Sequence, residues 1–424
     1  MYILIEKESF QMSENQNLTK KRWSVLIVSC IINVMIGTGY AWSMFVGPLN
    51  EHFVAMGFDT AMATLTWAFT LANSIGPIPM IIGGYINDNI GPKWSVFVGG
   101  IFFGGGVFVA GCATSPIMVV VGYGILMGLG MGLVYGCTIG NSVKFFPDKA
   151  GFVGGLTTAT YGLGSVILPL IIAKIVNPDT VLNTFKVLGI VYLVVICVGA
   201  FFITRCPVGF VPEGYQPPAP KAGVKAPESK NWKQMLADPI FYVMVIMMTA
   251  GATFGLMMIS KCKPVITAVI LEGDATATIA TLPVTILALF NALGRVGCGT
   301  ISDKIGRINT LTIMLVVGVV GLFLISRAGA GDTAIFMVGI CLVGLAFGSF
   351  MGVMPGFCAE QFGPKNNGVN YGIMFIGFSL AGIVGPKLLD AFEAPYTTAY
   401  YIAMGLGIVG LLLTFVYRAM SKAK

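Results

Sequence analysis

Uncharged, predominantly apolar runs follow one another along almost the whole chain. Cutting the sequence at every charged residue except Arg295 leaves eleven long runs. Ten of them suit a single transmembrane helix, because a span of the hydrocarbon core needs about 20 residues. The run at 94–143 is too long for one span and breaks at ATSP, residues 113–116, so it counts as two. The pattern predicts an all-α membrane protein with twelve transmembrane helices.

Composition agrees with a membrane location. Charged residues make up 10% of the chain and apolar residues 56%, whereas soluble domains carry about a quarter charged residues. We therefore expect the lipid bilayer to surround most of the protein. The formal net charge of +7 comes from basic residues spread over many loops, and this argues against a nucleic-acid-binding face.

The distribution of basic residues predicts the orientation in the membrane. Lysine and arginine near the ends of spans stay preferentially on the cytoplasmic side. With the N-terminus inside, cytoplasmic segments hold eighteen of the 25 basic residues, outer segments hold six, and Arg295 is the remaining one. This bias predicts a multi-pass protein of the cell (inner) membrane with both termini in the cytoplasm.

One long polar segment divides the chain. Residues 205–234 are rich in Pro and Lys and lack helical periodicity, so they suit a cytoplasmic linker. The predicted organisation is a cytoplasmic tail (1–22), an N-terminal six-helix bundle (23–204), the linker (205–238), a C-terminal six-helix bundle (239–418) and a second cytoplasmic tail (419–424).

Features of the first half recur in the second at a nearly constant shift along the sequence. Because each half holds an even number of helices, we expect two six-helix parallel pseudo-repeats with the substrate site between them. In the loops after helices 2 and 8 the shift is the same for the two glycines and the aspartate and smaller by one for the basic residue, and it is larger by one for spaced glycines in helices 4 and 10. Those glycines suit tight helix packing better than substrate contact. The matching positions are Gly84, Asp88, Gly91 and Lys93 with Gly299, Asp303, Gly306 and Arg307 in the loops, and glycines 128, 132 and 136 with 344, 348 and 352 in the helices.

The spacing G-x-x-x-D-x-x-G, followed by Lys two residues later in the first loop and by Arg directly in the second, resembles the signature loop of the major facilitator superfamily. The resemblance implies the major facilitator fold over essentially the whole chain. It also implies that these eight loop residues belong to a conformational gate on the cytoplasmic side and do not bind substrate. The glycines permit a tight loop, and the two aspartates can accept hydrogen bonds from helix-end donors and basic side chains.

Arg295 is the one charge inside an apolar run. It lies eight residues before Asp303 at the predicted cytoplasmic boundary, which places it about 12 Å into the membrane and close to the midplane of a ~30 Å core. A charge at that depth must face a polar cavity or a partner. None of the 18 acidic residues lies at comparable depth in the sequence. We therefore interpret the missing counter-ion as an anionic substrate.

A small monocarboxylate suits this position best. Arginine donates two parallel hydrogen bonds to a carboxylate and stays charged, and Asn291 shares its helix face and can orient the guanidinium or donate to the substrate. A dianion would favour a second cation at mid-depth, which the sequence does not supply. Apolar and hydroxyl-bearing side chains at similar depth suit a short organic acid as well as ordinary helix packing; they are Tyr40, Trp42, Tyr135, Tyr161, Phe347, Met351, Phe375 and Phe378.

Three stretches carry a closer resemblance. GTGYAWSMFVGPL, FFPDKAG and NALGR are similar to the oxalate/formate antiporter family and the related monocarboxylate transporters. The resemblance implies that Arg295 binds a substrate carboxylate. Phe378 stands where the oxalate carriers have a lysine, and Asn291 where animal monocarboxylate transporters have an acid, so neither oxalate nor proton coupling carries over directly. The cavity lining implied by the resemblance is Tyr40, Tyr135, Tyr161, Phe347 and Phe375.

These features predict a secondary active transporter of a small monocarboxylate of the lactate, acetate, pyruvate or formate class. We expect alternating access, anion exchange or coupling to a proton, and a monomer. An oxalate/formate-type dicarboxylate antiporter is the alternative. A channel would need a ring of selectivity groups, and a non-transporting receptor stays open although the polar tails are short for an output domain.

Catalytic and cofactor chemistry is not expected. The sequence places no His, Asp and Glu constellation at membrane depth for an enzyme or a metal centre. The nine cysteines lack a C-x-x-C pair and suit the role of small apolar residues.

Overall fold

The computed structural model describes residues 2–172, 175–207, 210–215, 229–273, 282–363 and 365–422. Within these ranges, the side chains at 2–16, 88, 150, 165, 169 and 422 lie outside the description. All regular structure in the described ranges is helical. Backbone hydrogen bonds within each helix satisfy the peptide groups, which is the condition for crossing a bilayer without a closed barrel.

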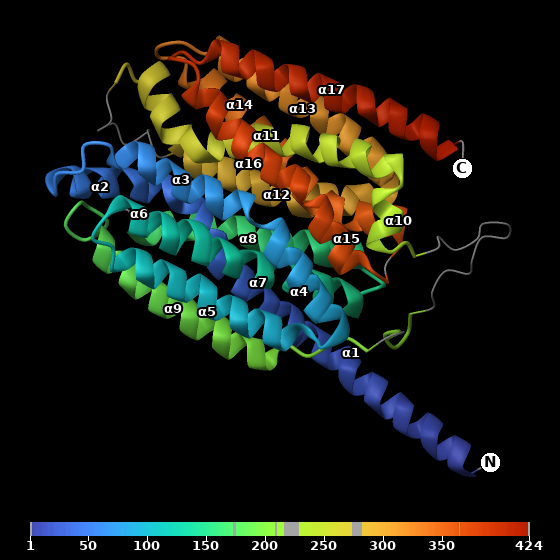
Figure 1. Cartoon of the computed structure of the whole chain (residues 1–424). Helices are drawn as coiled ribbons and strands as arrows, with labels where there is room; N and C mark the ends of the chain where they lie inside the picture. Colours follow the sequence, from blue (N-terminus) through green and yellow to red (C-terminus); the bar gives the residue numbers. More distant parts are fainter. Residues whose placement is uncertain are drawn as a thin grey trace.

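The helices of the first half lie together on one side of the molecule (Figure 1, blue to green). Their bounds are α1 (Tyr2–Gly37), the 3₁₀ turn η1 (Thr38–Ala41), α2 (Trp42–Ala55), α3 (Ala61–Ser74), α4 (Pro77–Asn89), α5 (Pro92–Gly111), α6 (Pro116–Val119), the π-helical η2 (Val120–Met127), α7 (Gly128–Phe145), α8 (Ala150–Ile172) and α9 (Val181–Phe202).

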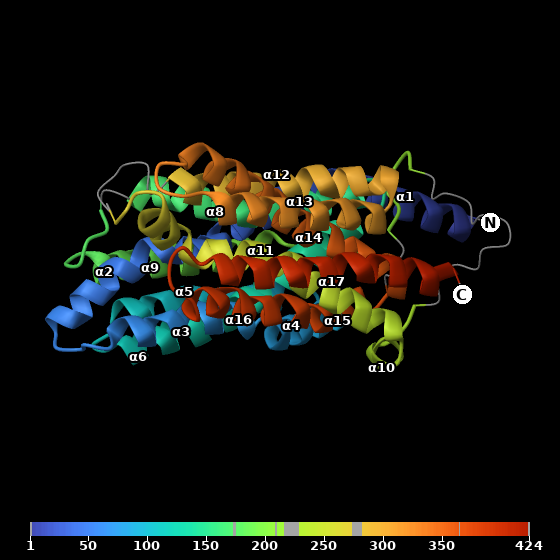
Figure 2. The ribbon, with the colours of Figure 1, turned by 90° about the horizontal axis from the view of Figure 1, so that it is seen from above.

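The helices of the second half pack beside them (Figure 1, yellow to red). They are α10 (Trp232–Leu236), α11 (Pro239–Val269), α12 (Leu282–Ile305), α13 (Arg307–Arg327), α14 (Thr333–Phe362), α15 (Asn367–Met374), α16 (Ile376–Asp390) and α17 (Thr397–Lys422). The start of α1 and the end of α17 lie at the same end of the bundle in both views (Figures 1 and 2).

Twelve segments of the described chain are long and apolar enough to cross a membrane. The predicted number is therefore confirmed, and the chain is a multi-pass membrane protein. The break predicted at 113–116 falls between α5 and α6. Four spans consist of more than one labelled element. The first is divided by the 3₁₀ turn η1 and the fourth by the π-helical η2, and a short irregular turn divides the second and the eleventh.

Two polar segments contain more helix than the sequence pattern suggests. Helix α1 begins at Tyr2 and runs through most of the predicted tail 1–22. In the predicted linker, 205–238, residues Trp232–Leu236 form the short helix α10. A capping box explains α10: the Gln234 amide N–H donates to the Asn231 side chain, while the Asn231 N–H donates to Gln234 Oε1, at 3.0 and 2.9 Å. Residues 208–209 and 216–228 of the linker lie outside the described ranges.

The glycine contacts follow the repeat. A methyl group added at Gly348 of α14 would lie 2.0 Å from the Asn291 carbonyl oxygen, and one added at Gly132 of α7 would lie 2.8 Å from the Gly76 carbonyl oxygen. Gly348 is the repeat counterpart of Gly132, and Asn291 is the counterpart of Gly76. The close helix approach predicted from the glycine spacing is present in both halves, which is why any larger side chain would displace the neighbouring backbone.

Candidate functional site

Helix α12 is held against two neighbours at the level of Arg295. A methyl group at Gly352 of α14 would lie 2.4 Å from the Arg295 carbonyl oxygen, and one at Gly155 of α8 would lie 2.9 Å from the same atom. With glycine backbones on both flanks, the Arg295 side chain is directed into the protein, where it is fully buried at 0% exposure. Sequence alone predicts an interior position for this side chain, and the structure places it away from lipid.

Neutral groups hold most of the guanidinium. Arg295 Nε donates to Asn291 Oδ1 at 2.9 Å, and Nη1 donates to the Thr158 carbonyl oxygen at 2.8 Å. Nη1 also makes a longer contact of 3.4 Å to the Tyr135 hydroxyl. The side chain of Asn291 thus holds one edge of the guanidinium by a hydrogen bond. Thr158 contributes through its backbone, so its residue type gives no signal that sequence reasoning could have used.

The charge of Arg295 has no acidic partner among the described side chains. No carboxylate in that part of the chain lies within 4.0 Å of its nitrogens, and the rings of Tyr161 and Phe347 lie 5.5 and 5.8 Å from the guanidinium carbon. Arg295 Nη2 and Asn291 Nδ2 are buried, with no hydrogen-bond partner in the described structure. Two buried donor groups are therefore available beside one uncompensated positive charge.

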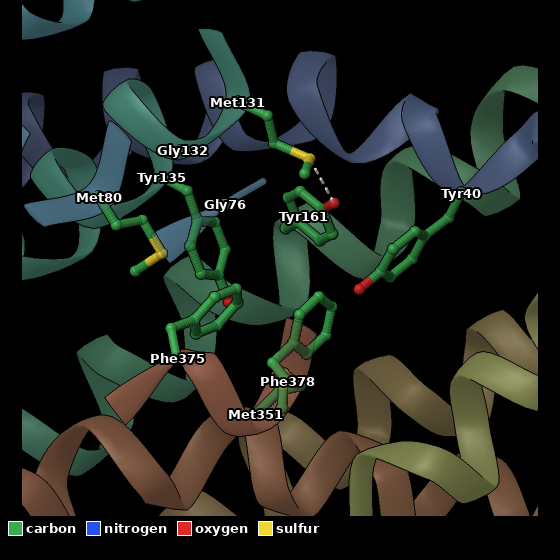
Figure 3. Close-up of a pocket in the computed structure, with 10 residues that line it drawn as sticks. All are labelled: Tyr40, Gly76, Met80, Met131, Gly132, Tyr135, Tyr161, Met351, Phe375 and Phe378. Atoms are coloured by element: carbon green, nitrogen blue, oxygen red, sulfur yellow. Dashed lines mark hydrogen bonds between the residues drawn. The ribbon is translucent and has the colours of Figure 1, made fainter. Parts of the chain in front are cut away.

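A cavity lies between the two halves (Figure 3), and Tyr135 and Tyr161 of its lining contact Arg295. About 320 Å³ of space among the lining residues is free of protein atoms, with open space at the mouth included. Six of the nine predicted substrate residues line it, while Arg295, Asn291 and Phe347 lie behind this wall. The lining residues are Tyr40, Gly76, Met80, Met131, Gly132, Tyr135, Tyr161, Met351, Phe375 and Phe378.

Three tyrosines separate the cavity from Arg295. Tyr161 packs edge-on against Tyr40 and Tyr135, with ring centroids 4.9 and 5.1 Å apart. Its hydroxyl donates to the Met131 sulfur at 3.1 Å (Figure 3). These contacts give the cavity hydroxyl groups next to the cation and an otherwise apolar wall, an arrangement that suits a ligand with one charged end.

Helix interruptions place several lining residues. Tyr40 lies in the 3₁₀ turn η1, Gly76 lies between α3 and α4, and Phe375 lies between α15 and α16. Irregular backbone at membrane depth is tolerated where it is enclosed in protein or lines a cavity. Sequence reasoning missed Gly76, Met80, Met131 and Gly132. The half-chain shift could have identified Gly76 and Met80, which are the repeat counterparts of Asn291 and Arg295.

The two loops predicted to form a gate differ in their contacts. Gly91 and Gly306 have φ values of 123° and 89°, which only glycine adopts readily. In the second loop, Arg307 Nη2 donates to Asp303 Oδ1 at 2.5 Å, and its Nε lies 3.6 Å from Glu360 Oε2. In the first loop, Lys93 lies 4.5 Å from the centre of the Phe201 ring. The side chain of Asp88 lies outside the described structure.

Both loops lie next to contacts between the halves. A methyl group at Gly151, near the start of α8, would lie 1.9 Å from Asp303 Oδ2, so this carboxylate sits against the N-terminal turn of a helix, where negative charge is favoured. A methyl group at Gly84 would lie 2.7 Å from the carbonyl carbon of Gly368. The remaining predicted loop residue is Gly299. A methyl group added there would lie 3.4 Å from the Gly151 carbonyl oxygen. The halves therefore meet closely beside both loops.

No group of three or more His, Cys, Asp or Glu side chains suited to a metal occurs in the described ranges. The site offers one cation, amide and hydroxyl groups, and an apolar wall. This chemistry suits binding of an anion rather than a covalent reaction.

A protein-family model described as the Major Facilitator Superfamily matches residues 30–386 and, in an overlapping range, 263–424. The chain belongs to the major facilitator superfamily. It is therefore a membrane transporter, and its relatives in this superfamily are transporters rather than enzymes.

Individual relatives agree with this assignment. The oxalate:formate antiporter of Oxalobacter formigenes is 28% identical over 417 residues, covering 97% of this chain and 95% of its own. The uncharacterized MFS-type transporter YhjX of Escherichia coli is 27% identical over 372 residues, covering 87% of each chain. The solved structure of an E. coli fucose:proton symporter superposes with a TM-score of 0.63 at 15% identity, covering 93% of this chain and 98% of the other, and confirms the predicted major facilitator fold.

Proposed function

We propose that this protein is a secondary active transporter of a small monocarboxylate of the formate, acetate, lactate or pyruvate class. The observation that carries the proposal is the state of Arg295. Its charge has no acidic partner in the described chain, and its Nη2 group has no hydrogen-bond partner there. A substrate carboxylate would supply both.

The electrostatics of the site favour an anion that is small and singly charged. At about 4 Å and an effective dielectric of about 20, the attraction between a carboxylate and the guanidinium is about 4 kcal/mol before desolvation costs. The cavity beside it supplies hydroxyl groups from tyrosines and a largely apolar wall. A second carboxylate would have no cation to face among the lining residues.

A dicarboxylate antiporter is the second candidate. It is favoured by the likeness to the oxalate:formate antiporter over 97% of this chain. That relative exchanges, by its name, a dianion for a monoanion, so both classes of substrate need to be compared directly. The apolar Phe378 in the cavity lining favours the monocarboxylate.

Transport would proceed by alternating access of the two halves, predicted as 23–204 and 239–418. A bound anion would cancel the charge of Arg295 and so permit closure around a dry cavity, whereas the empty carrier would keep an uncompensated buried cation. This favours exchange of one anion for another over uncoupled return. The loop residues near Asp303 and Gly84, where the halves meet closely, would separate when the site opens on their side.

The same proposal places both chain ends and the two gate loops in the cytoplasm of a cell whose inner membrane holds the protein. Cys112 is exposed in the loop between α5 and α6 and would then face outward. A membrane-impermeant maleimide should label it in intact cells, and a Cys112→Ser variant should remove that labelling. Labelling only after the cytoplasmic face is exposed would reverse the orientation.

Counterflow in proteoliposomes tests the transport function. Vesicles loaded with unlabelled acetate, lactate, pyruvate, formate or oxalate should take up the matching radiolabelled acid transiently above equilibrium, with the monocarboxylates faster than oxalate. Arg295→Gln should abolish this uptake for every acid while the purified variant still unfolds cooperatively. Equal uptake by wild type and Arg295→Gln would remove the proposal.

A further inference from the structure

The repeat pairs residues of the two halves across the cavity. One shift along the sequence relates α4 to α12, a shift larger by one relates α7 to α14, and a shift larger by two relates α8 to the pair α15 and α16. Applied to the site, these shifts match Gly76 with Asn291, Met80 with Arg295, Met131 with Phe347, Tyr135 with Met351, and Tyr161 with Phe378. Every one of these residues lines the cavity or lies directly behind its wall.

Backbone contacts support the match between Met80 and Arg295. A methyl group at Gly155 of α8 would lie 2.9 Å from the Arg295 carbonyl oxygen, and one at its repeat counterpart, Gly372 of α15, would lie 3.2 Å from the Met80 carbonyl carbon. Both residues therefore leave the backbone from equivalent places in the two halves, on opposite sides of the pseudo-symmetric site.

The two side chains differ completely in chemistry. Arg295 brings a permanent charge and several donors, whereas the Met80 thioether has neither charge nor donor. Met80 is 2% exposed and lines the cavity. Figure 3 shows Met80 and Tyr135 together among the residues that line the cavity. A ligand bound to Arg295 would therefore meet apolar atoms on the α4 side of the cavity.

We propose that Met80 is a specificity-determining residue, which restricts the site to acids with a single carboxylate and an apolar remainder. The inference rests on the proposed function and adds the reason for its selectivity. Binding a dicarboxylate would bury its second charge against a thioether and aromatic rings, without a hydrogen-bond donor in exchange. Met80 is unbranched and flexible, so it can fit tails of different shape.

Position 80 is better suited than 378 to carry this discrimination. Phe378 is stacked on Phe375, with ring centroids 4.5 Å apart, and it also lies 6.5 Å from Phe347. A basic residue at position 378 would therefore replace one ring of an aromatic cluster. Met80 instead occupies the backbone position that presents the guanidinium in the other half, so a basic side chain at 80 would face the cavity as a symmetric second cation.

Ligand binding by purified protein in detergent tests the inference. Formate, acetate, lactate and pyruvate would be compared with oxalate and malonate by isothermal titration and by the shift in apparent unfolding temperature. Wild type should bind at least one monocarboxylate at least about tenfold more tightly than either diacid. Met80→Lys should invert this preference by about tenfold or more, because the second carboxylate gains a charged partner.

Two matched variants control for size and folding. Met80→Leu keeps apolar volume and should retain the wild-type preference. Met80→Gln adds a hydrogen-bond donor without charge and should reduce the preference for monocarboxylates over diacids. This variant tests the inference if the lysine variant fails to fold. Unchanged selectivity in both polar variants would overturn the inference while leaving the transport proposal standing. Oxalate binding by wild type as tight as that of the best monocarboxylate would overturn the inference and favour the dicarboxylate antiporter. Absence of carboxylate binding by wild type would instead remove the proposed function itself, and this inference with it.

Discussion

Helices α12 and α4 occupy equivalent places in the two halves and carry opposite chemistry: Met80 of α4 lines the central cavity, whereas Arg295 of α12 lies directly behind its wall. Arg295 and Asn291 on α12 supply a charge and an amide, whereas Met80 on α4 and Gly76 just before it supply a thioether and a bare backbone. The backbones of Asn291 and Gly76 nevertheless make corresponding contacts with Gly348 of α14 and Gly132 of α7. The repeat thus preserves helix packing within this molecule while leaving the side chains free to differ, and the resulting asymmetry gives one half the cation and the other half the apolar wall.

Removing the charge from α12 should have the largest effect. Arg295→Gln should weaken binding of the preferred monocarboxylate by about 2 kcal/mol or more, which is at least about 30-fold, because the anion loses its charged donor. Isothermal titration measures this directly. The control is Met80→Gln, which introduces the same glutamine at the symmetric position. It should leave monocarboxylate affinity within a few fold of the wild-type value. Similar losses in both variants would contradict the asymmetric site.

The second-largest effect is expected when an acidic side chain of the protein itself neutralises Arg295. In Asn291→Asp, a carboxylate would replace the amide oxygen that lies 2.9 Å from Arg295 Nε and would compete with the substrate for the guanidinium. We expect monocarboxylate affinity at neutral pH to fall about tenfold or more. The apparent unfolding temperature should stay at or above that of wild type, since the buried cation gains a counter-ion. Unchanged affinity would mean that the substrate does not need this charge.

The packing that supports each helix can be compared with one substitution at symmetric positions. The added methyl group of Gly352→Ala would lie 2.4 Å from the Arg295 carbonyl oxygen, whereas that of Gly136→Ala has its nearest neighbour, Met80 Cε, at 3.7 Å. Gly352→Ala should therefore destabilise by about 1–3 kcal/mol and weaken binding, since α12 must move. Gly136→Ala should resemble wild type in a thermal-unfolding scan. Equal stability of the two variants would count against this account of how α12 is positioned.

A smaller effect is expected where the halves meet beside the gate loops. Gly84→Ala would place a methyl group 2.7 Å from the Gly368 carbonyl carbon, whereas its counterpart Gly299→Ala has its nearest neighbour, the Gly151 carbonyl oxygen, at 3.4 Å. Gly84→Ala should favour a conformation in which α4 and α15 separate. Distances between spin labels on the ends of these two helices should lengthen in Gly84→Ala and stay unchanged in Gly299→Ala. Identical distance distributions would contradict a gating role for this contact.

Much of this architecture could be predicted from the sequence because its signals are strong and local. Apolar runs of span length give the helix count, and a charge within such a run is rare enough to single out Arg295. The interaction of Asn291 with Arg295 also follows from helix periodicity.

Other parts of the site depend on tertiary contacts that leave no mark on residue type. The Thr158 carbonyl that binds Arg295 Nη1 would be present with any residue at that position. Met80 and Met131 resemble the many apolar residues that only pack helices together, so their place in the cavity lining becomes evident only once the halves are superposed by the repeat. The helix at Trp232–Leu236 was missed because a capping box stabilises a segment too short to show periodicity.

The most direct test of the central claim is an experimental structure of the protein with its preferred monocarboxylate bound. The account predicts a carboxylate oxygen within about 3 Å of Arg295 Nη2, with the remainder of the ligand against Met80 and the aromatic wall. A ligand bound elsewhere, with Nη2 still lacking an anionic partner or paired with an acidic side chain of the protein, would contradict it.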